Sequence, residues 1–369
     1  MTHTDIPHTV SRNMVAHTRT QAELERIIPI RVSRDLEAVA NIKKAWAFAE
    51  EAHTGQYRCS GEPYTEHLFQ TMRILGTLDM GTPTLIAGIL HDTIEDTKIS
   101  EIDIERIFGK EIAFLVVGLT KLERNKNDGA FYYSETLRKL LLAAAQDTRI
   151  LIIKLCDRLH NMQTLSHMPL TTRKRVSLET RNVYVPVAER LGMHAIKREL
   201  EDLSFSYIEP DSFKEAKCLY AKRASARKKN IIEATATLQL ELAVHSRIPF
   251  RIEQRDKGMY SFYQKLKRKE DDLSQINDII TLQVIVPDAD SCYTMLGKIH
   301  GLWCPVPRKF KDYISFPKPN GFQCLRTAVD AESLGIIEIQ IYSTEMYERA
   351  KYGFAVLLAR NESGCKSPK

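Results

Sequence analysis

Apolar residues recur with helical spacing along the first half of the chain, from about residue 36 to residue 191. The polar segment 121–133 contains a glycine and is predicted to be a mobile loop or lid. Pro63 suits the first position of a helix, which would place His67 about one turn inside it. The first half is therefore expected to be all-helical, with further helices at 45–52, 82–90, 101–120, 134–146, 148–165 and 172–190.

After Pro249 the pattern changes to a mixture of strands and helices. A β-branched run covers 279–286, and apolar and polar residues alternate over 336–341, so both segments are predicted to be strands. A basic loop with several prolines is expected at 303–321. This half is predicted to be α/β or α+β, with helices at 258–269, 290–302 and 344–358.

Residues 196–244 keep helical spacing but become charged, which indicates a connector with a break at Pro210. The first 30 residues are polar, and their histidines (His3, His8 and His17) lack the spacing of a metal site. Four parts are therefore expected: an arm (1–30), a helical domain (31–195), a helical connector (196–244) and an α/β domain (245–369).

Composition narrows the class of protein. A chain of 369 residues with 43% hydrophobic and 27% charged residues is ordinary for a globular protein of two or three domains. No apolar run reaches the length of a membrane span, and the N-terminus lacks a signal sequence. Seven cysteines without a C-x-x-C pair fit reduced thiols in the cytoplasm. The net charge of +6 suits a polyphosphate ligand, and we expect no nucleic acid or membrane partner.

The first candidate for chemistry is the stretch from His91 to Asp96, which follows a buried apolar helix. His91, Asp92, Glu95 and Asp96 place four ionisable groups beside a core, which is costly unless they are paired or bind a metal. On a continuous helix Glu95 would lie on the same face as His91 and Asp92. The stretch indicates a metal site with nearby carboxylates; an acidic helix end with a stray histidine is the alternative.

A second candidate is a polar stripe on the apolar helix 150–165. Lys154, Asp157, Asn161 and Thr164 fall on one face of that helix. Such a stripe is expected to face a wet site, unless it is simply the solvated face of the helix.

His67, His91, Asp92 and Asp157 come from separate segments and would form a mixed nitrogen and oxygen ligand set. Such a set suits Mn, Fe or Zn better than Mg or Ca. Glu95 and Asp96 could then orient or deprotonate water. The candidates for holding a phosphorylated substrate are Arg58, Ser60, Lys154 and Asn161.

The ordered motifs around these residues closely resemble the hydrolase half of long RelA/SpoT homologues, which make or degrade the alarmones pppGpp and ppGpp. The motifs are the segment 53–67, His91-Asp92-x-x-Glu95-Asp96, and the segment 153–165. The resemblance implies an HD-type phosphohydrolase with Mn2+ on the four ligands, Glu95 and Asp96 as catalytic residues, and removal of the 3′-pyrophosphate to give GDP or GTP. It implies substrate contacts from Arg58, Ser60, Tyr64, Lys154, Asn161 and Thr164.

The second half resembles the synthetase of the same family, which moves pyrophosphate from ATP to GDP or GTP. Asp278 matches its Mg2+-binding carboxylate and Glu338 its second acidic residue. Mg2+ is expected only if this half is active. The matching positions are Arg255, Lys257, Tyr260, Asp278, Lys311, Asp312, Lys318, Gln323, Glu338 and Gln340, and Phe322 stands at a further position of the same site.

The synthetase motifs also depart from the family pattern. Phe322 replaces a tyrosine, Arg326 a histidine, and Gln283 and Tyr342 each an arginine. Loss of cations near a polyphosphate should weaken transition-state stabilisation. We therefore expect a SpoT-like hydrolase with a degenerate synthetase domain that acts as a structural or regulatory brace. The alternatives are a bifunctional enzyme and a second domain that only binds a nucleotide or partner.

Long family members continue into a regulatory C-terminal half. This chain ends at Lys369, just after the synthetase-like region, so we expect it to be the catalytic N-terminal region of a longer protein.

Overall fold

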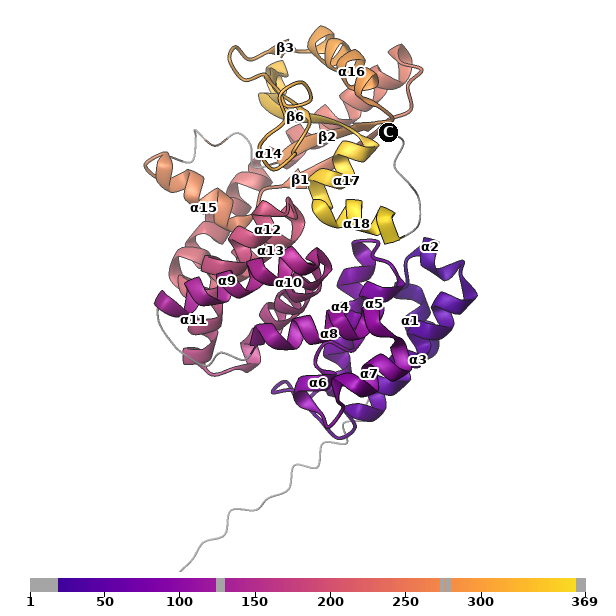
Figure 1. Ribbon diagram of the computed structural model, residues 1–369. Coiled ribbons are helices and arrows are strands. Elements are labelled where there is room, and N and C mark those ends of the chain that lie inside the picture. The colour runs from indigo at the N-terminus through magenta and orange to yellow at the C-terminus, as the bar shows by residue number, and fades with distance from the viewer. Residues whose placement is uncertain (1–18, 124–129, 273–275, 277–279, 363–369) are drawn as a thin grey trace, which may run out of the picture.

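The computed structural model describes residues 19–123, 130–272, 276 and 280–362 (Figure 1). The first half is helical, as predicted. A capping box from Thr20 and Glu23 starts the first helix, and the following helices build one apolar core. The helices of this half are α1 (Gln21–Ile27), α2 (Ile30–Ser33), α3 (Leu36–Ala52), α4 (Tyr64–Thr77), α5 (Thr82–Ile89), α6 (Thr93–Asp96), α7 (Glu101–Phe108), α8 (Lys110–Glu123), α9 (Ala130–Gln146), α10 (Thr148–Gln163), α11 (Leu170–Glu179) and α12 (Val185–Arg190), with a π-helical turn at Thr180–Tyr184.

Helix α10 lies at the centre of this half. Its residues Ile150 to Ile153 are all buried, and it packs against α4, α8, α9 and α13 (His194–Ile208). The predicted polar stripe is not a solvated face, because Lys154 and Asp157 are both buried. Arg158 is also held inside, by Glu179 and the hydroxyl of Tyr184.

Several predicted elements have different limits in the structure, and the helix expected at 45–52 begins as early as Leu36. The helix expected at 101–120 is broken at Gly109, whose φ of +89° favours glycine. The loop expected at 121–133 is shorter, because α8 runs to Glu123 and α9 starts at Ala130; residues 124–129 lie outside the described residues. The helix expected at 344–358 is two helices, α17 (Thr344–Tyr352) and α18 (Phe354–Glu362), separated by Gly353.

The connector consists of α13 and the long helix α14 (Pro210–His245), with the predicted break at Pro210. The boundaries of the four expected parts remain a prediction. No helix within the described ranges is long and apolar enough to cross a membrane.

The second half is a mixed sheet with helices, as predicted. Its strand order is β1-β2-β6-β5-β3, with β4 also paired to β5, and β2 runs parallel to β6 while the other pairs are antiparallel. Four strands were missed: β1 is polar along its length, β3 and β4 are two-residue strands within the segment expected to be a loop, and β5 follows that segment. The elements are β1 (Arg251–Asp256), α15 (Met259–Arg268), β2 (Ile280–Val286), α16 (Ala289–Leu302), β3 (Cys304–Pro305), β4 (Lys311–Asp312), β5 (Leu325–Asp330) and β6 (Ile336–Ser343).

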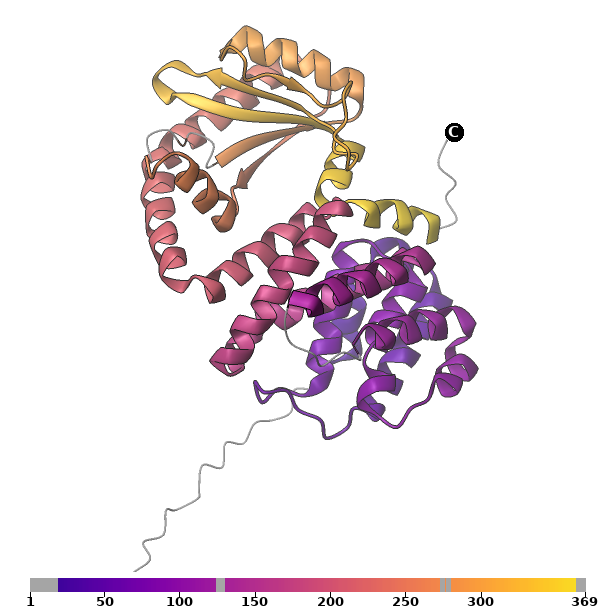
Figure 2. The same cartoon turned by 60° about the vertical axis from the view of Figure 1, so that its left-hand side comes forward.

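Alternation along the strands separates two faces of the sheet. Leu282 and Val284 of β2 join the core formed with α14 and α16, which cover one face (Figure 2). Thr281 and Gln283 point to the opposite face, where the candidate synthetase residues lie. The chain then returns through α17 to α18, whose Ala355 and Ala359 are buried in the helical core of the first half.

Candidate metal centre

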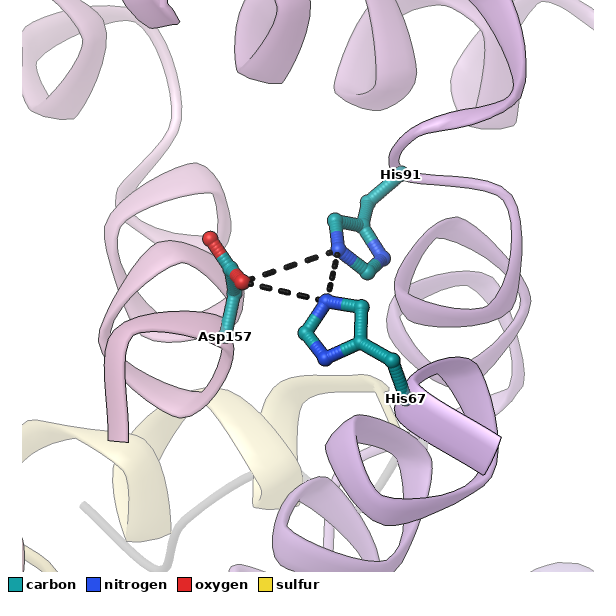
Figure 3. Close-up of side chains that lie close together, drawn as sticks. All are labelled: His67, His91 and Asp157. Carbon is teal, nitrogen blue, oxygen red and sulfur yellow. Dashed lines mark hydrogen bonds and ion pairs between the residues drawn. The ribbon is translucent and has the colours of Figure 1, made fainter. Parts of the chain in front are cut away.

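The structure brings together three of the predicted ligands from different elements. His67 lies in the first turns of α4, His91 in the turn that follows α5, and Asp157 within α10 (Figure 3). Their side chains point toward one another, and one ligand atom from each lies within 4.8 Å of the others. All three are buried, so the cluster is a compact site on the inner side of the helices.

The turn that carries His91 corrects one prediction. Helix α5 ends at Ile89, and α6 starts only at Thr93, so no continuous helix relates His91 to Glu95. The amide of Asp96 donates to the carbonyl of Asp92 at 2.9 Å, so these two residues are separated by one helical turn. The break places His91 and Asp92 at the centre, while Glu95 and Asp96 remain exposed beside it.

The ring nitrogens and a carboxylate oxygen are close to one another. His67 Nε2 lies 3.1 Å from His91 Nε2 and 3.2 Å from Asp157 Oδ1. Asp92 Oδ2 lies 2.9 Å from His91 Nε2 and 3.6 Å from His67 Nε2. Asp92 therefore borders the cluster, and its role as a fourth ligand remains a prediction.

Hydrogen bonds fix which nitrogen of each ring faces the centre. His91 Nδ1 lies 2.8 Å from the carbonyl of Gly88 and must donate to it. His160 Nδ1 accepts from the guanidinium of Arg58 at 3.2 Å, so in its 2.7 Å contact with His67 Nδ1 it must again be the acceptor. Both His67 and His91 therefore carry their proton on Nδ1 and turn the Nε2 lone pair toward Asp157.

Two lone pairs and a carboxylate oxygen at these distances repel one another unless a cation lies among them. This donor set fits a divalent metal ion, with neutral histidines whose other nitrogen is held by a hydrogen bond. His160 was not recognised from the sequence as part of the site. Burial, His67 and Arg58 lower its pKa to about 3, which keeps it neutral and able to accept.

The charge states of Asp157 and His91 also favour the binding of a cation at the cluster. Burial opposes the charge of Asp157, but Lys154, His67 and His91 outweigh it and hold its pKa far below the ordinary value. Burial likewise disfavours the charged form of His91, yet Asp92 and Asp157 raise its pKa. The two carboxylates thus favour positive charge beside the His91 ring, which a bound cation would supply.

The polar stripe of α10 forms one wall beside the cluster. Lys154 Nζ pairs with Asp157 Oδ2 at 2.7 Å, and Asn161 donates to Asp157 Oδ1 at 2.5 Å. Arg58 donates to Asn161 Oδ1 at 2.6 Å. A cavity of about 400 Å³ opens here, and all six predicted substrate contacts line it, namely Arg58, Ser60, Tyr64, Lys154, Asn161 and Thr164.

Tyr64 makes a further connection that the sequence did not show. Its hydroxyl lies 2.6 Å from Asp92 Oδ2 and 2.9 Å from Asp96 Oδ2. Burial and the two carboxylates raise its pKa well above the ordinary value, so the hydroxyl remains a donor. Tyr64 thus joins the buried Asp92 to the exposed Asp96.

Comparison with known proteins identifies both halves. The model described as "HD domain" matches residues 45–194, and the model described as "Region found in RelA / SpoT proteins" matches residues 254–362. The chain belongs to the RelA/SpoT family. The motifs that suggested this family from the sequence therefore led to the correct assignment.

Curated RelA/SpoT proteins extend the similarity to most of the chain. A GTP pyrophosphokinase of Myxococcus xanthus is 41% identical over 318 residues, which cover 85% of this chain and 42% of that protein. The bifunctional (p)ppGpp synthase/hydrolase SpoT of Escherichia coli K12 is 39% identical over 329 residues, covering 89% of this chain and 47% of SpoT. The chain therefore spans less than half the length of these relatives.

The RelA/SpoT region contains a second set of cavities on the polar face of its sheet. Arg255, Lys257, Glu338 and Gln340 line a cavity of about 210 Å³. Arg255 also borders a neighbouring cavity of about 290 Å³. These predicted positions are brought together, whereas Asp278 lies outside the described residues.

The other predicted positions lie beside these cavities. Phe322 lines a separate cavity of about 110 Å³, and Lys318 Nζ lies 5.0 Å from the centre of its ring. Gln323 donates to the carbonyl of Ile314, and Lys311 is exposed on β4.

Residues that depart from the family pattern contact the retained ones. Arg326 pairs with Glu338 at 2.8 Å. Tyr342 donates to Gln340 Oε1 at 2.7 Å, and Gln283 Nε2 lies 3.4 Å from the same oxygen. The substitutions thus form two groups of contacts, one at Glu338 and one at Gln340.

Proposed function

We propose that this protein hydrolyses the 3′-pyrophosphate of (p)ppGpp, with Mn2+ at the cluster, and releases GDP or GTP and pyrophosphate. The observation that carries the proposal is the convergence of His67, His91 and Asp157, because Asp157 also lines the cavity that Arg58 and Lys154 border. The metal ligands and the cations for a phosphorylated substrate thus share one site. The names of relatives, including a guanosine-3′,5′-bis(diphosphate) 3′-pyrophosphohydrolase of Aquifex aeolicus that is 39% identical over 340 residues, support the substrate class.

His67, His91, Asp157 and the adjacent Asp92 would hold the metal ion, which when bound would act as a Lewis acid on a phosphoryl oxygen and would lower the pKa of water. The mixed nitrogen and oxygen donors favour Mn2+ over Mg2+. His160 and the carbonyl of Gly88 hold the two rings in the ligand tautomer. Lys154 offsets part of the negative charge of Asp157.

The side chains around the cavity bind and orient the substrate in this proposal. Arg58 and Lys154 offer positive charge to the phosphates, while Ser60, Asn161 and Thr164 offer hydrogen bonds. Glu95 and Asp96 are exposed beside the cluster and accept the proton of the attacking water. Tyr64 orients Asp96 by donating to its carboxylate.

We further propose that the RelA/SpoT region synthesises little or no ppGpp. The support is the ion pair between Arg326 and Glu338, since a carboxylate held by a guanidinium is a weaker base and a weaker magnesium ligand. Gln283 and Tyr342 supply neutral groups where the family pattern has cations. The second candidate is a bifunctional enzyme, which the retained cavity with Arg255 and Lys257 favours.

The decisive experiment measures both reactions with the purified chain. Release of pyrophosphate from ppGpp is expected with Mn2+ and not after chelation, and incubation of ATP with GDP and Mg2+ is expected to give negligible ppGpp. Absence of Mn2+-dependent hydrolysis would contradict the first proposal. Robust synthesis of ppGpp would contradict the second proposal and would show that the enzyme is bifunctional.

A further inference from the structure

The helix α18 is part of the RelA/SpoT region in sequence but of the helical half in space. Ala355 and Ala359 are buried in the core of the helical half, and Figure 1 shows α18 beside those helices. At the corner that precedes α18, the backbone of Gly353 and Phe354 lies close to the backbone of Leu191. The amide of Phe354 donates to the carbonyl of Leu191 at 2.8 Å, and a Cβ at Gly353 would lie 2.1 Å from that same oxygen.

The last described residue of α18, Glu362, reaches the start of α5. Its carboxylate accepts from the backbone amide of Gly81 at 2.6 Å and from the hydroxyl of Thr84, also at 2.6 Å. Gly81 precedes the first residue of α5 and has no side chain with which to cap it. A carboxylate at this end satisfies an unpaired donor and is favoured by the helix dipole.

The same carboxylate also approaches the helix that carries Asp157. Glu362 Oε1 lies 3.2 Å from a guanidinium nitrogen of Arg149, in the first turn of α10. Arg149 additionally pairs with Asp147, which caps α10. The side chain of Glu362 is only 8% exposed, so these contacts are shielded from water.

The fit between Gly81 and Glu362 is tight. A Cβ added to Gly81 would lie 2.6 Å from the Cβ of Glu362. The φ of Gly81 is −80°, which any residue can adopt, so space rather than conformation explains the glycine. Two positions 281 residues apart in the chain are therefore matched to each other.

Helix α5 leads directly into the turn with His91 and Asp92. It has eight residues and a length of about 12 Å, so a change at its start is transmitted through a short rigid element to the ligands. We propose that Glu362 is a positioning residue for the metal centre, and that α18 thereby couples the RelA/SpoT region to the hydrolase. The proposal rests on the hydrolase function proposed above.

The test compares Glu362→Gln, which removes the charge, Thr84→Val, which removes one hydroxyl donor, and the double variant. Asn361→Ala is the matched control, because Asn361 is the exposed neighbour on α18. Mn2+ affinity is measured from the electron paramagnetic resonance of free Mn2+, and ppGpp hydrolysis is measured across Mn2+ concentrations. Circular dichroism verifies that each variant is folded.

Glu362→Gln is expected to weaken Mn2+ binding about fivefold and to leave the KM for ppGpp unchanged. Excess Mn2+ should restore its rate, which a general loss of folding would prevent. The double variant should lose less affinity than the sum of the two single variants, because both changes weaken the same contact.

Two results would overturn the positioning role: wild-type Mn2+ affinity in Glu362→Gln, or an equal loss in Asn361→Ala. If the wild-type chain binds Mn2+ but does not hydrolyse ppGpp, the proposed function fails. The affinities of the variants still decide the role of Glu362 in that case.

Discussion

At the scale of single residues, the metal centre depends on which atoms carry protons. Arg58 can only donate, so its bond to His160 determines that His160 accepts from His67 and that His67 turns its lone pair inward. The guanidinium of Arg58, at the wall of the cavity, thus fixes the tautomer of His67. Arg58 at the cavity and His67 in the cluster are thus joined by the imidazole of His160.

Replacement of Asp157 by asparagine should remove most of the metal affinity. The side chain keeps its shape but loses the charge that faces His67 and His91. We expect Mn2+ affinity and hydrolysis each to fall by about 100-fold or more. Isothermal titration and a pyrophosphate-release assay measure the two losses. Asp211→Asn, whose side chain is 98% exposed, is the control and should behave as the wild type.

The pKa of His194 predicts a dependence of stability on pH. Burial, together with Lys197 and Arg255, lowers this pKa to about 4. The unfolded chain therefore binds a proton more readily, and stability is lost as the pH falls from about 6.5 toward 4. The contribution at pH 7 is about 2 kcal/mol after allowance for partial exposure.

Urea unfolding at pH 7.5 and pH 5 tests this expectation. The free energy of unfolding should fall less between the two pH values in His194→Gln than in the wild type. His245→Gln, on the exposed end of α14, serves as the control. An equal pH dependence in wild type and His194→Gln would assign the effect to other groups.

The grouping of the candidate site residues was predictable from the sequence where it follows from motif and spacing. His67, His91 and Asp157 were predicted as ligands and lie together, as do the six substrate positions in their cavity. The sequence could not show that His160 fixes the tautomer of His67, because that depends on ring orientation. Glu362 was missed for a different reason, since it contacts Gly81 only after the chain has folded back.

At the scale of elements, glycines set the ends of helices that periodicity alone extends too far. Gly109 and Gly353 both have positive φ and separate helices that the apolar pattern predicted as single ones. The breaks at Leu90 and Pro210 have different causes, namely a tight turn and a missing amide donor. Apolar spacing reports the buried face of an element but not the residue at which the backbone changes direction.

Gly353→Ala should strongly destabilise the fold. The new Cβ would meet the carbonyl of Leu191 and also require a φ of +62° in a non-glycine residue. We expect a loss of more than about 2 kcal/mol, measured as the shift in the urea midpoint. Gly335→Ala is the matched control, because Gly335 has a φ of +79° but no atom within 4 Å of a new Cβ. A similar loss in both variants would indicate backbone strain alone.

The strands show the same limit of predicting structure from the apolar pattern. β2 and β6 were predicted because their inner faces are apolar, whereas Arg251–Asp256 contains only one apolar residue and was missed. Its pairing with β2 places Arg255 opposite Thr281 and beside the candidate synthetase cavities. An edge strand next to a site can be polar because part of it faces a cavity rather than a core.

At the scale of the whole molecule, a metal ion would tie together segments from three parts of the helical half. α4, the turn after α5, and α10 are separated by many residues and meet at one cluster. Ligand binding to the native state alone stabilises it by mass action. The metal centre is therefore expected to contribute to folding as well as to chemistry.

Thermal unfolding with and without Mn2+ measures this contribution. Mn2+ at about 100 times its dissociation constant should add about 2.7 kcal/mol to the free energy of unfolding, and chelation should remove it. Asp157→Asn is the control and should show little response to Mn2+. A similar Mn2+ response in the variant and the wild type would place the binding elsewhere on the chain.

The small cavity of about 110 Å³ gives the two halves a shared boundary. Leu191 and His194 come from the end of the helical half, Phe322 from the loop before β5, and Gly353 and Phe354 from the corner that leads into α18. Any coupling between a ligand bound in this cavity and a metal ion bound at the cluster must act equally in both directions. If a ligand at Phe322 changes metal affinity by some factor, bound metal must change the affinity for that ligand by the same factor. Binding at the RelA/SpoT region would then be linked to binding at the metal centre even if that region catalysed no reaction of its own.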